Sequence, residues 1–397
     1  YVQNVLLDSN LITNQYYYGV YYYYVNSIST SYNTVTPRNV NQGTTWYGMR
    51  LYQNKNGGNI IGNKIHANNA DITSSIYGLY TYYIDSALVA NNEIYLNSTA
   101  TNTYGIYIDY PKGSKYLHNS VLITGSTTTA RALYWYVYSS DSYDATVMNN
   151  LFITNTSGST PYAVYLAGTY SSTYAYNYRI DYNNYYSTGN MGYVGSAQAT
   201  LANWKSVVIS DIHSSFILPV FAHVNTNLEL TDYSAFIVPR MPEVDRDIQN
   251  YLRSVVTNMG AYVREPSDID AQIVEFIGFS TAYANGSSLP ISVVVRNAGF
   301  TPLSSATISG QINGVDITPV AYTNSVPLQY GEADTVSIGS YVFTVGTNQI
   351  MVAVTMNADT IQENDTIRDS RYMCANIMGG EYVIGASPLA DYSSVDL

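Results

Sequence analysis

Proton-transfer chemistry requires acidic, basic and histidine side chains close together, and the chain offers one such group. Asp109, Lys112, Lys115 and His118 follow one another closely. A carboxylate can take a proton as a general base, and a lyase also needs a lysine or arginine close to that proton. The same four residues are typical of a solvated loop with a chance ion pair, which is the interpretation we favour.

Metal-dependent and nucleophilic chemistry have even less support in the sequence. Asp141 and Asp144 could share a cation, although the segment Ser139–Ser142 has the composition of an ordinary turn. None of the 4 histidines has a second histidine at metal-ligand spacing, and the single cysteine, Cys374, excludes an internal disulfide framework. The sequence therefore predicts no catalytic site, no cofactor and no metal site.

Tyrosine is the side chain whose number and spacing most suggest a function. The chain contains 44 tyrosines, and many lie two or four residues after a small residue that recurs along the chain. The contact residues predicted from this spacing are Tyr21, Tyr23, Arg50, Tyr52, Tyr80, Tyr82, Tyr107, Tyr134, Tyr136 and Tyr165. Rows of exposed rings are typical of a binding surface. One alternative is that the rings only strengthen the pairing of neighbouring strands. Another is that a neighbouring domain or cap segment folds over them.

A repeated element must position these rings, and two landmarks define its period. The first is a glycine or alanine at positions 19, 48, 78, 105, 132 and 163. The second is an asparagine followed two residues later by an aliphatic residue, or by an aromatic one in the last two cases, at positions 10, 33, 63, 92, 119, 150 and 184. Both recur at intervals of about 30 residues. Such a period indicates stacked supersecondary units that cannot bury their apolar faces alone.

The local pattern identifies each unit as a coil of short β-strands. Residues alternate around each small residue, so an aliphatic side chain and a tyrosine fall on opposite sides of a strand. Six to seven coils stacked about 4.8 Å apart would form a parallel β-solenoid. The asparagines are expected to form a ladder between coils. The inner column is expected to contain Val20, Met49, Leu79, Ile106, Leu133 and Val164.

Two parts of the chain resemble known β-helix proteins. Over residues 1–190, the asparagine landmark and the coil length resemble the right-handed parallel β-helix of pectate-lyase-like proteins. In residues 191–265, the strings Thr200–Trp204, Asp211–Ser214 and Asn258–Tyr262 resemble the closing segment of β-helix proteins secreted by Bacteroidota-type bacteria. The resemblance implies that this segment caps the last coil, since an open solenoid end exposes apolar side chains and strand edges.

The remaining residues have a different pattern. In residues 266–372, alternating strands separated by turn signals such as Asn313-Gly314 predict an immunoglobulin-like β-sandwich. The strings Val293–Gly299 and Glu363–Thr366 resemble adhesion-related sandwich domains of bacterial surface proteins. Residues 373–397 resemble the opening of another β-helix unit and are expected to begin a further repeat.

Composition narrows the possible partners. The net charge of −12 argues against nucleic acid as a partner, and no apolar run is long enough for membrane insertion. The chain opens within a motif and lacks a signal peptide, so we expect a piece of a longer secreted protein. We interpret it as a non-enzymatic extracellular adhesin of the cell surface that contacts a glycan, a cell-surface protein or identical repeats. The alternatives are a structural subunit of a filament or sheath, and a polysaccharide lyase or hydrolase.

Overall fold

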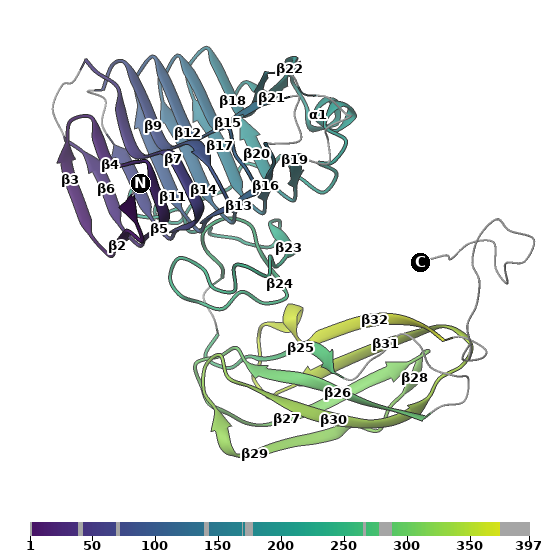
Figure 1. Cartoon of the computed structure of the whole chain (residues 1–397). Helices are drawn as coiled ribbons and strands as arrows, with labels where there is room; N and C mark the ends of the chain where they lie inside the picture. The colour runs from purple at the N-terminus through teal and green to yellow at the C-terminus, as the bar shows by residue number, and fades with distance from the viewer. Residues whose placement is uncertain are drawn as a thin grey trace, which may run out of the picture. The chain divides into compact units, whose positions relative to one another are not determined.

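The computed structural model describes residues 2–38, 43–68, 72–138, 143–168, 170, 178–264, 267–277 and 288–373. Asp141 and the predicted further repeat from residue 374 onward lie outside the described residues. The chain divides into two compact units, residues 1–265 and 266–397. The fold is all-β: a parallel β-helix is followed by a β-sandwich (Figure 1).

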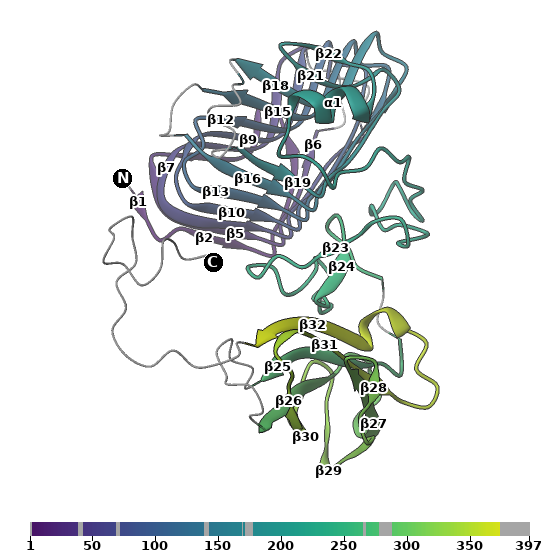
Figure 2. The same ribbon diagram turned by 90° about the vertical axis from the view of Figure 1, so that its right-hand side faces the viewer.

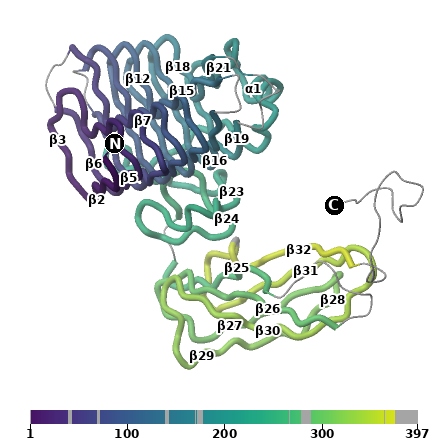
Figure 3. Tube along the Cα trace, in the orientation of Figure 1, coloured from purple at the N-terminus to yellow at the C-terminus, as the bar shows by residue number. Residues whose placement is uncertain are grey.

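The β-helix consists of three faces, here called sheets A, B and C, whose strands pair in parallel from coil to coil (Figures 1 and 3). Sheet A contains β1 (Val2–Gln3), β2 (Leu6–Asp8), β5 (Val25–Ser31), the second half of β7 (Trp46–Ile61), β10 (Ala87–Ala90), β13 (Ser114–Leu117), β16 (Ala145–Met148) and β19 (Tyr178–Asp181). Sheet B contains β3 (Leu11–Gln15), β6 (Thr34–Pro37), β8 (Lys64–Asn68), β11 (Glu93–Ser98), β14 (Ser120–Gly125), β17 (Leu151–Thr156) and β20 (Asn184–Ser187). Sheet C contains β4 (Tyr18–Tyr23), the first half of β7, β9 (Ser75–Ile84), β12 (Asn102–Asp109), β15 (Thr129–Val137), β18 (Thr160–Gly168) and β21 (Asn190–Val194).

The predicted inner column is confirmed. Its six residues pair in register along sheet C, and all are buried in the core of the β-helix. The small residue before each of them also faces inward. A Cβ atom on Gly78 would lie 2.5 Å from Ile94 Cγ2 of sheet B. Two consecutive residues therefore face the core at this position, which breaks strict alternation and turns Tyr77 and Tyr80 outward together.

The asparagine ladder is also present, with one change of residue. The backbone N–H and the Nδ2 group of each asparagine both donate to Oδ1 of the asparagine in the next coil. For Asn92 these two distances to Asn119 Oδ1 are 3.0 and 2.9 Å, and Asn92 Nδ2 also donates to Ile60 O at 2.8 Å. The last amide in the ladder belongs to Asn183, to which Asn150 donates at 3.0 and 2.9 Å. Asn184, which the repeat spacing selected, instead binds Ser215 and Ile217.

Residues 191–265 cover two different surfaces. After β22 (Ser196–Gln198), helix α1 (Leu201–Val207) places Trp204 against the last coil, where a Cβ atom on Gly192 would lie 2.6 Å from the indole. Residues 217–264, here called the strap, lie along the outer face of sheet B and contain β23 (Ile237–Pro239) and β24 (Val256–Asn258). Only the first part of the predicted cap therefore covers the end of the solenoid.

No helix in the described ranges is long and apolar enough to span a bilayer.

The second unit is an immunoglobulin-like β-sandwich, as the sequence predicts. One sheet contains β25 (Ala271–Ile277), β26 (Ser288–Asn297) and β30 (Ala333–Val342). The other contains β27 (Leu303–Ile312), β28 (Val315–Asp316), β29 (Val320–Leu328), β31 (Gly346–Thr355) and β32 (Thr366–Met373), and the 3-10 helix η2 (Gln362–Asn364) precedes β32. The pairs are antiparallel, and alternate residues such as Val293, Val295, Val352 and Val354 form the core between the sheets.

Candidate contact surface on sheet C

All ten predicted contact residues lie on the outer face of sheet C. One column runs through Tyr21, Arg50, Tyr80, Tyr107, Tyr134 and Tyr165, and pairing extends it to Tyr193. We call it the middle column. A lateral column contains Tyr23, Tyr52, Tyr82, Asp109 and Tyr136. The structure therefore brings the predicted residues together on one continuous face.

A third column completes this face, and its residues are not among those predicted from the sequence. It consists of Tyr18, Tyr47, Tyr77, Tyr104, Arg131 and Tyr162. We call it the inner-edge column and use the name tyrosine face for the three columns together. Strict alternation from the small residue would have placed these side chains in the core. The signal was nevertheless present, because a tyrosine or an arginine precedes each recurring glycine or alanine.

The rings of the tyrosine face stack on one another along the solenoid. In the middle column, the ring centroids of Tyr80 and Tyr107 are 4.7 Å apart, and those of Tyr107 and Tyr134 are 4.4 Å apart, with planes within 17°. In the inner-edge column, Tyr77 stacks on Tyr47 and Tyr104 at 4.7 Å each. The inner-edge and middle columns meet edge to face, as Tyr77 does with Tyr80 and Tyr104 with Tyr107, at 5.5 Å each. Because the faces of these rings contact each other, their edges and hydroxyl groups point outward.

Exposure varies along the tyrosine face. Tyr21 and Tyr23, in the first coil, are 42% and 52% exposed. In later coils Tyr80, Tyr107 and Tyr134 are partly buried by their neighbours. This stacking gives weight to the interpretation that the rings stabilise strand pairing, and a binding role must use the surface that stacking leaves accessible.

Each column contains one charged residue, and a tyrosine hydroxyl binds each of them. Arg50 Nη1 donates to Tyr18 Oη at 3.0 Å, and Arg131 Nη1 donates to Tyr104 Oη at 3.3 Å. The Arg131 guanidinium also lies over the Tyr165 ring, 3.9 Å from its centroid. In the lateral column, Tyr138 Oη donates to Asp109 Oδ1 at 2.7 Å. The charges are therefore held within the tyrosine network.

Burial also controls the protonation of this face. It raises the pKa values of Tyr77, Tyr80 and Tyr107 well above that of a free tyrosine. Burial likewise raises the pKa of Asp109, although the hydrogen bond from Tyr138 opposes the increase. These hydroxyl groups stay protonated at neutral pH and can donate hydrogen bonds.

The residues considered for proton transfer are not brought together into one site. Lys112 Nζ lies 3.8 Å from Asp85, and Lys115 pairs with Glu243 of the strap. His118 is buried and contacts Asn149 and the Asn258 carbonyl at 3.1 Å each, and burial holds its pKa well below the usual value.

Of the two residues considered for cation binding, the structure describes Asp144. Asp144 accepts a hydrogen bond from the Gly113 backbone at 2.7 Å. Its predicted partner Asp141 lies outside the described residues.

Two features of the sandwich were not anticipated. Oxygen atoms of Asp270, Asp359 and Asp365 lie within 4.8 Å of one another, and Asn364 Nδ2 donates to Asp270 at 3.0 Å. Carboxylates so arranged are the ligands that hard cations such as Ca²⁺ prefer. The signal was the position of Asp365 within the motif Glu363–Thr366, with Asp359 a few residues before it.

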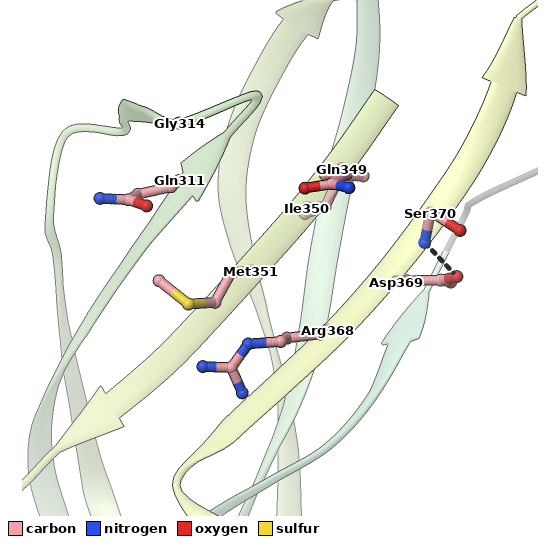
Figure 4. Close-up of a pocket in the computed structure, with 8 residues that line it drawn as sticks. All are labelled: Gln311, Gly314, Gln349, Ile350, Met351, Arg368, Asp369 and Ser370. Atoms are coloured by element: carbon pink, nitrogen blue, oxygen red, sulfur yellow. Dashed lines mark hydrogen bonds between the residues drawn. The ribbon is translucent and has the colours of Figure 1, made fainter. Parts of the chain in front are cut away.

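The second feature is a shallow pocket over β27, β31 and β32 (Figure 4). Its lining residues are Gln311, Gly314, Gln349, Ile350, Met351, Arg368, Asp369 and Ser370. Asp369 accepts a hydrogen bond from the Ser370 backbone at 2.7 Å and contacts Arg371 Nη2 at 2.6 Å. These contacts hold the carboxylate within its own strand, and we assign the pocket no chemistry.

Comparisons with known proteins identify no family. No family model matches the chain, and no curated protein matches it. Among solved structures, the crystal structure of the CARDB domain of the PF1109 protein from Pyrococcus furiosus, in complex with di-metal ions, is similar at 16% identity. The match covers 28% of this chain and 100% of that chain, with a TM-score of 0.25. The solution structure of the same domain matches at 18% identity, covering 28% and 99%, with a TM-score of 0.24.

Proposed function

We propose that this chain is a non-enzymatic binding segment of an extracellular surface protein and that the tyrosine face is its contact surface. The observation that carries the proposal is the contrast between the two faces. The strap covers the apolar outer face of sheet B, whereas the tyrosines of the tyrosine face keep part of their surface accessible. Tyrosine and arginine are also the residues that contribute most at binding surfaces.

The partner is a glycan or a protein on another cell, and the rigid solenoid holds the contact residues in fixed positions. The dispersal of Asp109, Lys112, Lys115 and His118 supports a binding role over catalysis, because each has its own structural partner. A filament subunit would use the same face for lateral contact with identical molecules.

The test is to replace Tyr80, Tyr107 and Tyr134 together with serine and to screen the full chain against arrayed glycans and surface proteins. We expect binding to weaken about a hundredfold, because an aromatic contact contributes about 1 kcal/mol beyond its buried area. The matched control replaces Tyr32 and Tyr372 with serine, since these tyrosines are 44% and 63% exposed but lie off sheet C.

Three outcomes would redirect the proposal. Unchanged affinity of the triple variant would remove the tyrosine face from binding. Concentration-dependent assembly of the wild-type chain, lost in the triple variant, would favour the filament subunit. Ultraviolet absorbance from unsaturated sugars, abolished by Asp109→Ala, would favour a lyase.

A further inference from the structure

The orientation of the rings restricts how the tyrosine face can bind. Sugars usually stack on the flat face of an aromatic ring, but here those faces are taken by neighbouring rings. Tyr107 has Tyr80 on one side at 4.7 Å and Tyr134 on the other at 4.4 Å, and both neighbours are stacked. Tyr165 and Tyr193 continue the row with a stacked contact at 4.3 Å. Ring edges and hydroxyl groups are what this row offers to a partner.

The tyrosines of the middle column form a regular row. Strands β9, β12, β15 and β18 pair in register along the solenoid (Figures 1 and 2), so the middle column presents one tyrosine in each successive coil. Parallel strands are separated by about 4.8 Å. An extended β-linked pyranose chain advances by close to one strand spacing per sugar. A glycan lying along the solenoid would therefore meet a new hydroxyl group at almost every sugar.

The charges of the face favour a neutral partner. Only three residues of its columns are charged, Arg50, Arg131 and Asp109, so the face carries at most one net positive charge. An acidic polymer would need cations free to pair with it, and a nucleic acid would need many more of them. The chain carries a net charge of −12, which also disfavours close approach of a second copy.

We propose that the tyrosine face binds a neutral, extended glycan lying parallel to the solenoid axis, and that it does so through tyrosine hydroxyl groups and not by stacking. This inference rests on the proposed function and deepens it. Hydroxyl groups donate and accept, as sugar hydroxyls do, so the two rows can form reciprocal hydrogen bonds. Tyrosine hydroxyls are protonated at neutral pH, so they are available as donors as well as acceptors.

The decisive variant replaces Tyr80, Tyr107 and Tyr134 with phenylalanine, which keeps the rings and their stacking but removes three hydroxyl groups. The probes are oligosaccharides of β-1,4-linked glucose, mannose and xylose, with polygalacturonate as the acidic comparison. We expect affinity for a neutral probe to fall tenfold to a hundredfold, since each lost neutral hydrogen bond has a modest net effect. The thermal midpoint should stay at the wild-type value, and Tyr32→Phe with Tyr372→Phe should bind normally.

The outcomes separate this inference from the proposed function. If the serine variant loses binding but the phenylalanine variant does not, the face is a contact surface that acts through its rings, and the hydroxyl inference is wrong. If neither variant loses binding, both are wrong. Preference for polygalacturonate that disappears with salt or in Arg50→Gln/Arg131→Gln would show recognition of charge and overturn the inference. Wild-type self-association without glycan binding would also overturn it.

Discussion

The outer faces of sheets B and C belong to the same coils, but their side chains are shielded from water in different ways. On sheet B, Tyr95, Leu122, Leu151 and Ile153 are at most 4% exposed because the strap lies over them. On sheet C, tyrosines cover one another by stacking from coil to coil. Aliphatic side chains cannot be left in water at this density, whereas tyrosines supply their own cover and keep a polar edge. The residue type on an outer face thus decides whether the face needs another segment.

The attachment of the strap shows a further difference between the faces. Glu93, fully buried on sheet B, accepts hydrogen bonds from Leu228 N at 3.1 Å and from the Tyr262 hydroxyl, and it also contacts His66. Arg253 is buried as well and donates to Asn91 Oδ1 at 2.8 Å. Buried polar groups of this kind require specific partners, so they fix the position of the strap as apolar contacts alone would not.

The largest expected effect comes from the core that both faces share. Ile106→Asp should lower the free energy of unfolding by several kcal/mol, because it places an unpaired carboxylate between Leu79 and Leu133. Urea denaturation followed by tryptophan fluorescence measures the loss, and the 3 tryptophans all lie in the first unit. A variant as stable as the wild type would show that the inner column is wrongly placed.

Two substitutions with smaller expected effects compare the outer faces of sheets B and C directly. Leu122→Ala should lower the free energy of unfolding by about 3 kcal/mol, because it opens a cavity between sheet B and the strap. Tyr107→Ala should lower it by only about 1 kcal/mol, because the lost ring is partly exposed and its contacts are stacking contacts. The same denaturation assay measures both. Equal losses would mean that stacking covers a face as effectively as the strap does.

A pH-dependent effect is expected at the end of the solenoid. Asp211 accepts hydrogen bonds from Trp204 Nε1 and Tyr185 Oη at 2.7 Å each. Burial raises the pKa of Asp211 to about 6. The two hydrogen bonds oppose this increase, and the charge of Asp181 adds a little to it. A raised folded-state pKa adds stability that is complete below the unfolded value, near 4, and is lost as pH rises through about 6.

In Asp211→Asn this part of the pH dependence should disappear. Thermal midpoints of the full chain between pH 4 and 8, followed by tryptophan fluorescence, provide the measurement. Parallel curves for the variant and the wild type would show that Asp211 does not titrate in this range. Where the strap meets the coils the contributions oppose each other, because burial raises the pKa of Asp247 of the strap but lowers that of His118 of the coils.

Much of the fold could be predicted because it repeats. The small-residue and asparagine landmarks define the coils, and the inner column follows from them. The error over Asn183 and Asn184 arose because two adjacent asparagines satisfy the same spacing, and only strand register chooses between them. The strap could not be predicted, since it is irregular and its partners on sheet B, such as Leu122, have the same sequence pattern as core residues.

The contact surface was predicted in position but not in form. Counting from the glycine located the middle and lateral columns, whose role in binding stays a prediction. The inner-edge column was missed because Gly78 and Leu79 both face inward, a break that period-two counting cannot detect. Nor could the sequence show that rings such as Tyr80 and Tyr107 stack on each other and so cover each other's flat faces. The orientation of a ring depends on side-chain packing across coils.

The asparagine ladder has a mechanical consequence. Its hydrogen bonds, like those between the paired strands, run along the solenoid axis, so tension applied between the two ends acts on one coil junction at a time. Each junction that opens releases a coil of about 30 residues, which can extend to roughly 100 Å. Under tension, the first unit would lengthen in steps of this size. Each step would dissipate work before the load reaches the next asparagine of the ladder.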